Sequence, residues 1–99
     1  MNETAFVIVK FGYKGKNDES IRDIMDNIFT PYFGGLNGRL DLIDVKNKEV
    51  RLGVFQDYTG EFENVEEFLG KKVKSEVLFM LAVDEDYVPN TLEVVEIRP

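Results

Sequence analysis

Apolar residues recur along this chain with two different periods, which predicts both strands and helices. The segment Ala5–Phe11 is apolar on both faces, is interrupted only by Lys10 and ends at Gly12. A short run of this kind, rich in β-branched and aromatic residues, is typical of a central strand. We therefore expect the chain to begin with a strand in the middle of a sheet.

An amphipathic helix is predicted next, because apolar residues then recur every three or four positions. Asn17 or Asp18 suits the first position of such a helix, and Asp18 also suits the positive end of its dipole. Pro31 disfavours helical geometry at the residue before it, so we expect the helix to end near Phe29. The apolar positions are Ile21, Ile24, Met25, Ile28, Phe29 and Tyr32.

Two segments with alternating apolar residues, Arg39–Val45 and Val50–Phe55, predict a β-hairpin across the polar residues 46–49. The alternation changes phase between Leu42 and Ile43 in the first segment. A β-bulge in that strand, or burial of both of its faces at one end, would explain the change of phase. Thr91–Ile97 predicts one more strand near the end of the chain.

The segment between the hairpin and the last strand allows two interpretations. Asn64 can cap a helix, and Glu67 follows three residues later, as in a capping box. If this helix continues through Val83, the element order is β-α-β-β-α-β, the ferredoxin-like arrangement. If Gly70 ends it, Val77–Val83 becomes a buried fifth strand. Seven consecutive apolar residues favour the strand, whereas the Leu, Met and Ala among them favour the helix.

Both interpretations give one α+β domain over residues 1–99. It has a single mixed or antiparallel sheet of four to five strands, with helices mainly on one face. A length of 99 residues and a hydrophobic fraction of 43% suffice for one core but not for two. Ala5–Phe11 and Val77–Val83 would then lie in a sheet that its helices cover on one side only. The other face would need a partner, most simply a second copy.

The composition narrows the possible chemistry. The chain contains neither cysteine nor histidine, which excludes disulfides, thiolate ligands and imidazole bases. Its net charge of −7 disfavours direct binding to nucleic acid or to an anionic membrane. The first residues lack the basic start and the cleavage site of a signal peptide, and no apolar run is long enough to span a membrane. We expect a cytoplasmic protein without a cofactor.

Two groups of side chains are candidates for partner contacts. Four aromatic residues fall at predicted turns, where exposed rings often anchor partners. An acidic segment follows Val83 and could present carboxylates. It departs from a calcium loop at Val88 and Pro89, so we predict no metal site, and no catalytic motif is present. The candidate interaction residues are Tyr32, Phe33, Tyr58, Phe62, Asp84, Glu85 and Asp86.

These patterns predict a non-catalytic protein-interaction module that self-associates through a sheet face or edge. One alternative is an acidic inhibitor or decoy that binds a basic nucleic-acid-binding protein, an idea motivated by the net charge. Another is a small enzyme or ligand-binding domain that uses Lys, Tyr or carboxylate side chains. The first alternative predicts a salt-sensitive partner, and the second predicts a pocket with a buried, pKa-shifted side chain.

Overall fold

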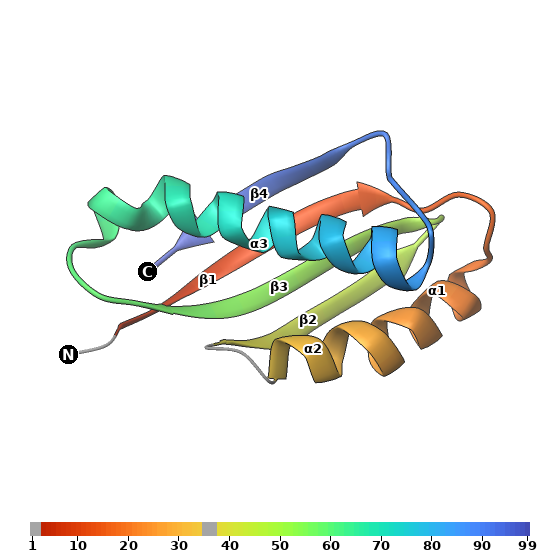
Figure 1. The fold of residues 1–99 in the computed structure, drawn as a ribbon, viewed down its shortest axis with the longest axis horizontal. Coiled ribbons are helices and arrows are strands. Elements are labelled where there is room, and N and C mark those ends of the chain that lie inside the picture. The colour runs from red at the N-terminus through yellow and green to blue at the C-terminus, as the bar shows by residue number, and fades with distance from the viewer. Residues whose placement is uncertain (1–2, 35–37) are drawn as a thin grey trace.

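A computed structural model describes residues 3–34 and 38–99 (Figure 1). The first helical segment has three parts, and the second is one long helix. The elements in chain order are β1 (Glu3–Gly12), α1 (Asp18–Ile24), the π-helical turn η1 (Met25–Phe29), α2 (Thr30–Gly34), β2 (Gly38–Lys46), β3 (Glu49–Tyr58), α3 (Phe62–Asp84) and β4 (Leu92–Arg98).

The strands of the described chain form one antiparallel sheet in the order β2-β3-β1-β4. With the two helical segments as crossovers, this is the β-α-β-β-α-β arrangement of a ferredoxin-like fold. Both helical segments lie on the same face of the sheet (Figure 1). The predicted α+β class, with a central first strand and helices on one face, is confirmed.

The five-stranded alternative is wrong, because Val77–Val83 lies within α3. The helix turns Val77, Met80 and Leu81 toward the sheet, where all three are buried. Phe79 and Val83 belong to the same apolar run but point to solvent. The seven-residue run is therefore a helix that is apolar on its exposed side as well. Among the described residues, no helix has the length and apolar character needed to cross a membrane.

Gly70 lies inside α3, not at the end of a helix, and it faces β4. A Cβ atom at this position would lie 2.9 Å from Ile97 Cδ1 and 3.4 Å from Val94 Cγ2. The missing side chain therefore allows α3 to approach β4 closely. The predicted capping box is also wrong, since α3 begins at Phe62 and the Asn64 backbone N–H donates to the Glu61 carbonyl oxygen at 3.0 Å.

The first helical segment begins as predicted but continues beyond Phe29. The Asn17 side chain accepts a hydrogen bond from the Ser20 backbone N–H at 2.8 Å. The expected end near Phe29 is wrong, because the helix widens into a π turn just before Pro31, which has no N–H to donate. The Met25 carbonyl oxygen accepts from both the backbone N–H and the hydroxyl of Thr30.

The hairpin between β2 and β3 turns through Asn47 and Lys48, whose φ values of 53° and 61° are typical of a two-residue type I′ turn. The Asp18 carboxylate accepts hydrogen bonds from both backbone N–H groups of this turn, at 3.0 and 2.8 Å. The start of α1 is therefore fastened to the tip of the hairpin.

Both edge strands contain an irregularity in their pairing. Of the two explanations for the change of phase in β2, the bulge is confirmed, but it lies earlier than the pattern indicated. The register shifts between Leu40 and Leu42 and leaves Asp41 as the extra residue. In β4 the register shifts between the partners of Ile8 and Val9, which leaves Val95 as the extra residue. A bulge at an edge bends the strand and interrupts its row of unpaired backbone groups.

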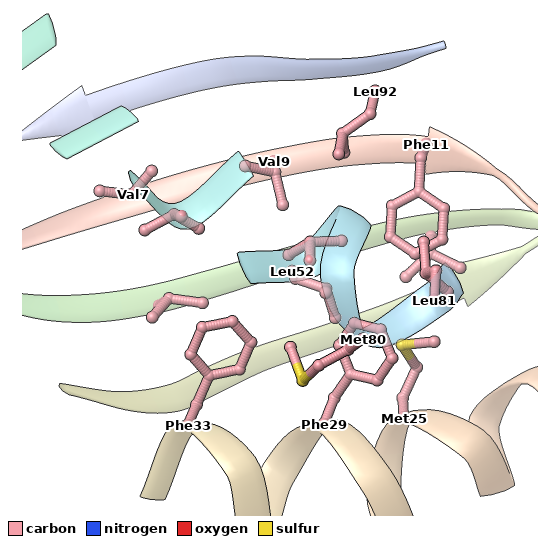
Figure 2. Packing of buried hydrophobic residues seen from close by; sticks show 14 of the residues in the cluster. Val7, Val9, Phe11, Met25, Phe29, Phe33, Leu52, Met80, Leu81 and Leu92 are labelled. Atoms are coloured by element: carbon pink, nitrogen blue, oxygen red, sulfur yellow. The ribbon is translucent and has the colours of Figure 1, made fainter. Parts of the chain in front are cut away.

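The core fills the space between the helices and the sheet. Figure 2 shows Met25, Phe29 and Phe33 pointing from the first helical segment toward the sheet. Met80 and Leu81 enter the same cluster from α3. The inward positions of β1 are Ala5, Val7, Val9 and Phe11, and those of β3 include Val50, Leu52 and Val54; all are buried.

The close approach at Gly70 predicts a graded response to side-chain size. Gly70→Leu should destabilise the fold by about 1–3 kcal/mol, because a large side chain must displace β4 or α3. Gly70→Ala should be nearly neutral. Its methyl group is too close only to the far end of the Ile97 side chain, which can shift, its contact with Val94 is an ordinary one, and alanine is a better helix former than glycine. Urea unfolding of the three proteins measures this, and a leucine variant as stable as the wild type would contradict the close packing.

Candidate functional site

The sheet face opposite the helices is not covered by any element of the described chain (Figure 1). Because successive side chains of a strand alternate between faces, Phe6 and Ile8 of β1 point away from the helices. Phe6 is paired in register with Phe55 of β3, and their ring centroids are 4.7 Å apart. The two rings are half-buried and Ile8 is only 8% exposed. Phe6, Ile8 and Phe55 together form an apolar surface at the bottom of the open face, which we call the apolar floor.

A hollow of about 590 Å³ lies over this floor and is bordered by opposite charges. Arg98 of β4 stands on one side, with its Cζ 5.0 Å from the Phe6 ring centroid and its Nε 3.0 Å from Glu96 Oε2. Asp41 of β2 stands on the other side. The residues that line the hollow are Phe6, Ile8, Asp41, Phe55, Arg98 and Pro99.

The other half of the same face is polar. Lys10 Nζ lies 3.2 Å from Glu93 Oε1 across the β1–β4 pair, and Arg51 is paired in register with Asp44. A second hollow of about 450 Å³ at this end is lined by Asp44, Lys46, Asn47, Glu49 and Arg51. Among the side chains that the structure describes, the apolar part of the open face is therefore confined to the half that carries Phe6 and Phe55.

The four candidate aromatic residues lie in two edge-to-face pairs. Tyr32 and Phe33 have ring centroids 5.5 Å apart, and Tyr58 and Phe62 have theirs 5.9 Å apart. The expectation that Phe33 is an exposed anchor is wrong, because α2 continues past Pro31 and carries this ring into the core, where it is fully buried. Tyr32, Tyr58 and Phe62 are half-buried against the same core.

The acidic candidates lie at the opposite end of α3 from Phe62. Asp84 is the last residue of the helix and is exposed, and Asp86 has a φ of 51°. Glu85 is half-buried and its Oε2 lies 3.7 Å from Lys16 Nζ. Within the part of the chain that the structure describes, no group of three or more acidic side chains is placed to hold a metal ion.

Two tyrosines fasten this end of α3 to the end of β1. Tyr13 and Tyr87 stack with ring centroids 4.2 Å apart, and the Tyr87 hydroxyl donates to the Gly12 carbonyl oxygen at 2.6 Å. Burial of Tyr13, followed by the nearby charge of Glu85, raises the pKa of its hydroxyl to about 12. A phenol with that pKa stays protonated at neutral pH, so the Tyr13 hydroxyl is not a general base there, and the stacked pair joins α3 to β1.

The outer side of α3 carries exposed apolar residues that the sequence interpretation did not single out. Phe68 is 65% exposed, Phe79 is 60% exposed and Val83 is 63% exposed. The two phenylalanines are separated by about 16 Å along the helix axis. At that separation the two rings do not touch each other.

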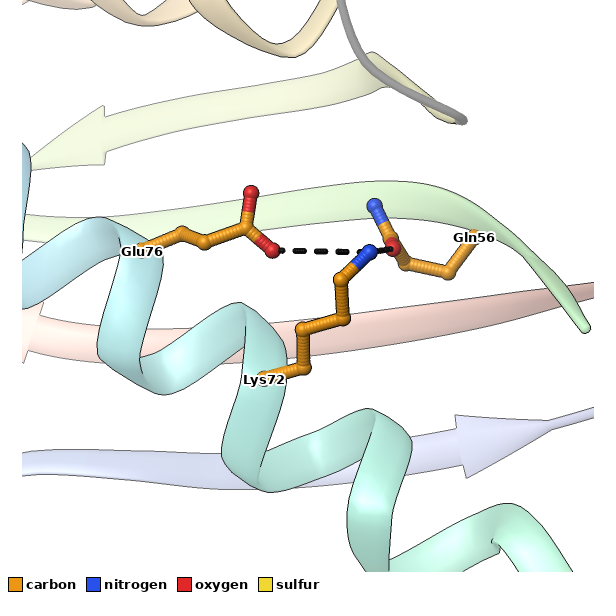
Figure 3. Close-up of polar contacts among 3 residues, drawn as sticks. All are labelled: Gln56, Lys72 and Glu76. Carbon is orange, nitrogen blue, oxygen red and sulfur yellow. Dashed lines mark hydrogen bonds and ion pairs between the residues drawn. The ribbon is translucent and has the colours of Figure 1, made fainter.

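A polar cluster lies between α3 and β3 (Figure 3). Lys72 Nζ donates a hydrogen bond to Gln56 Oε1 at 2.7 Å and lies 3.7 Å from Glu76 Oε1. Gln56 is fully buried, and both carboxylate oxygens of Glu76 are buried without a hydrogen bond. Burial raises the pKa of Glu76, and the Lys72 ammonium offsets that rise only in part.

Among the described side chains, this cluster most resembles the pocket with a buried, pKa-shifted side chain that an enzyme or ligand-binding domain would require. It contains a buried carboxyl with a raised pKa, but the three surface hollows described for this chain are lined by other residues. Its three side chains contact one another between a helix and a strand. The cluster therefore links α3 to β3.

Comparison with protein-family models finds no matching family, and searches of curated proteins and of solved structures find no significant match. The function must therefore be inferred from the geometry of the open face and of the buried cluster.

The buried carboxylate predicts a stabilising substitution. Glu76→Gln should raise the free energy of unfolding at neutral pH by about 1 kcal/mol, because it removes a buried charge that lacks hydrogen bonds. A raised pKa means that the native state holds this proton more tightly than the unfolded chain does. The wild type therefore regains stability as the pH falls through the carboxyl range, and its difference from the variant should shrink. Urea unfolding at several pH values measures this; a variant that is less stable at neutral pH would show that the Lys72 ion pair dominates.

Proposed function

We propose that this protein is a non-catalytic interaction module that self-associates through the open face of its sheet. The observation that carries the proposal is the Phe6–Phe55 pair, which forms an apolar floor with Ile8 on a face that no described element covers. Apolar side chains at the centre of a face and charged side chains around them are the usual composition of an interface.

The face is a better interface than either edge of the sheet. Each edge strand contains a bulge, at Asp41 in β2 and at Val95 in β4. Proteins use edge bulges and edge charges to prevent strand-to-strand pairing. Along β4 the charged residues are Glu93, Glu96 and Arg98. At either edge, a bulge interrupts the row of backbone N–H and C=O groups with which a strand of a second copy would have to pair.

The face is also a better interface than the outer side of α3. Phe68 and Phe79 are more exposed than Phe6 and Phe55, but they stand apart on the convex surface of a single helix. A four-stranded face offers more continuous contact. With strands about 4.8 Å apart and seven to ten residues of about 3.3 Å each, it projects to roughly 500 Å².

A second copy explains the charge of this face better than a basic partner does. The face carries charges of both signs, including the Lys10–Glu93 pair and the Arg98–Glu96 pair. A basic partner would favour a surface whose charges have one sign. Because each copy has a net charge of −7, self-association should strengthen as salt screens the repulsion between copies.

We also propose a cytoplasmic location, which the absence of cysteine supports.

The test compares apolar-to-acidic substitutions at two exposed residues, one at the edge of the sheet on β4 and one on α3. Val95 is 43% exposed on the bulge of β4, and Phe79 is exposed on the outer side of α3. Val95→Glu should shift the monomer–dimer equilibrium at least tenfold toward monomer, whereas Phe79→Glu should leave it unchanged. Analytical ultracentrifugation over a range of protein and salt concentrations measures both, with circular dichroism as the check of folding.

Two outcomes would overturn the proposal. A wild-type protein that stays monomeric at millimolar concentration and high salt would remove self-association altogether. Dissociation by Phe79→Glu but not by Val95→Glu would move the interface to α3.

A further inference from the structure

The hollow on the open face is bordered by an acidic residue on one edge of the sheet and a basic residue on the other. Asp41 is in β2 and Arg98 is in β4, and these strands are the two edges of the sheet order β2-β3-β1-β4. Followed through the register of β3, Asp41 lies level with Val7 and Ile8 of β1. Arg98 lies level with Phe6. The two charges therefore stand one or two residues apart along the strand direction, on opposite sides of the apolar floor.

A two-fold axis parallel to the strands relates these charges to each other in a second copy. Such an axis, lying between the two faces and over the middle of the sheet, reverses the order of the strands but keeps each residue at its level. It places β2 of one copy opposite β4 of the other, and β3 opposite β1. Asp41 then faces Arg98 of the second copy, and the reciprocal contact forms by symmetry.

We propose that two copies pack face to face about a two-fold axis parallel to the strands, with Asp41 of each copy paired to Arg98 of the other. This inference rests on the proposed self-association through the open face, and it adds the orientation of the partner. The same axis brings the Phe6–Phe55 pair of one copy onto the Phe55–Phe6 pair of the other. The apolar floors therefore meet at the centre, with an ion pair on each side.

The alternative axis, perpendicular to the strands, gives a poorer match. If this axis is level with the hollow, it places each strand opposite the same strand of the other copy. Asp41 then lies near Asp41 of the other copy and Arg98 lies near the other Arg98. Like charges across an interface are unfavourable.

The end of the face that carries Lys10 and Arg51 lies away from the centre of contact. If the sheets were flat, Lys10 of one copy would face Arg51 of the other, and these like charges would repel. Twisted sheets that pack face to face cross at about 30° and diverge away from their centre of contact. Lys10 and Arg98 both have a partner within their own copy, since Lys10 Nζ lies 3.2 Å from Glu93 Oε1 and Arg98 Nε lies 3.0 Å from Glu96 Oε2. The contact with Asp41 of the other copy therefore adds a second carboxylate to Arg98.

The area available predicts a weak dimer. A projected face of roughly 500 Å² per copy lies below the ~800 Å² per partner of a standard stable interface. Rim ion pairs contribute modestly to affinity but strongly to the choice of partner orientation. Charge reversal at Asp41 and Arg98 is therefore a direct test of orientation.

The experiment uses the complementary variants Asp41→Arg and Arg98→Asp. Each variant alone should self-associate at least tenfold more weakly than the wild type. In its homodimer, positions 41 and 98 carry the same charge and face each other at two symmetry-related places. Mixing the two should restore association as a heterodimer, because both ion pairs can then form. One pair joins the two substituted side chains, and the other joins the native Arg98 of one variant to the native Asp41 of the other. Native mass spectrometry distinguishes the heterodimer from the homodimers because the variants differ in mass.

Matched controls separate orientation from a general effect of charge. Glu67→Arg and Lys71→Asp make the same charge reversals on α3, where the wild-type side chains pair at 3.0 Å and are exposed. These variants should associate like the wild type. The double variant Asp41→Arg, Arg98→Asp should also self-associate like the wild type, which excludes misfolding as the cause of the single-variant effects.

The outcomes distinguish this orientation from the underlying self-association. Single variants that associate as strongly as the wild type, or a mixture that is not restored, overturn the orientation. If Val95→Glu still dissociates the protein in that case, the open face remains the interface. A wild type that never associates overturns both proposals.

Discussion

The packing of α3 against the middle of the sheet is the contact on which the rest of this structure depends. Val73, Val77, Met80 and Leu81 of the helix are all buried on the side of the sheet formed by Val9 and Leu52. Gly70 brings the same helix close to β4. Since the first helical segment packs beside α3, one face receives both helices and the other receives none. Burial of apolar surface on the covered face is the main term that stabilises the fold.

The uncovered face follows from the alternation of side chains along β1. Successive side chains of a strand point to opposite faces of the sheet. Because Val7 and Val9 point into the core, Phe6 and Ile8 must lie on the open side. The ring of Phe55 and the guanidinium of Arg98 shield Phe6, which keeps the exposed apolar area small. Such a face suits weak, concentration-dependent association of copies that also repel one another through their net charge.

Much of the fold could be predicted from the sequence, because periodicity reports which sides of an element are apolar. The central position of Ala5–Phe11, the helix start at Asn17 and the bulge in β2 all followed from it. The nature of Val77–Val83 did not, because a helix with an exposed apolar side has the same pattern as a buried strand. Nor did the Phe6–Phe55 pair, which depends on a register that no local pattern specifies. Phe33 was assigned to a surface because Pro31 usually ends a helix.

The central claim is that copies of this protein meet through the face the helices leave open. Isotope-filtered NMR on a mixture of labelled and unlabelled protein measures this contact directly. The account predicts intermolecular nuclear Overhauser effects between the methyl groups of Ile8 in one copy and the ring protons of Phe6 or Phe55 in the other. An associated sample that shows intermolecular effects only at Phe68, Phe79 or Val83 would contradict it.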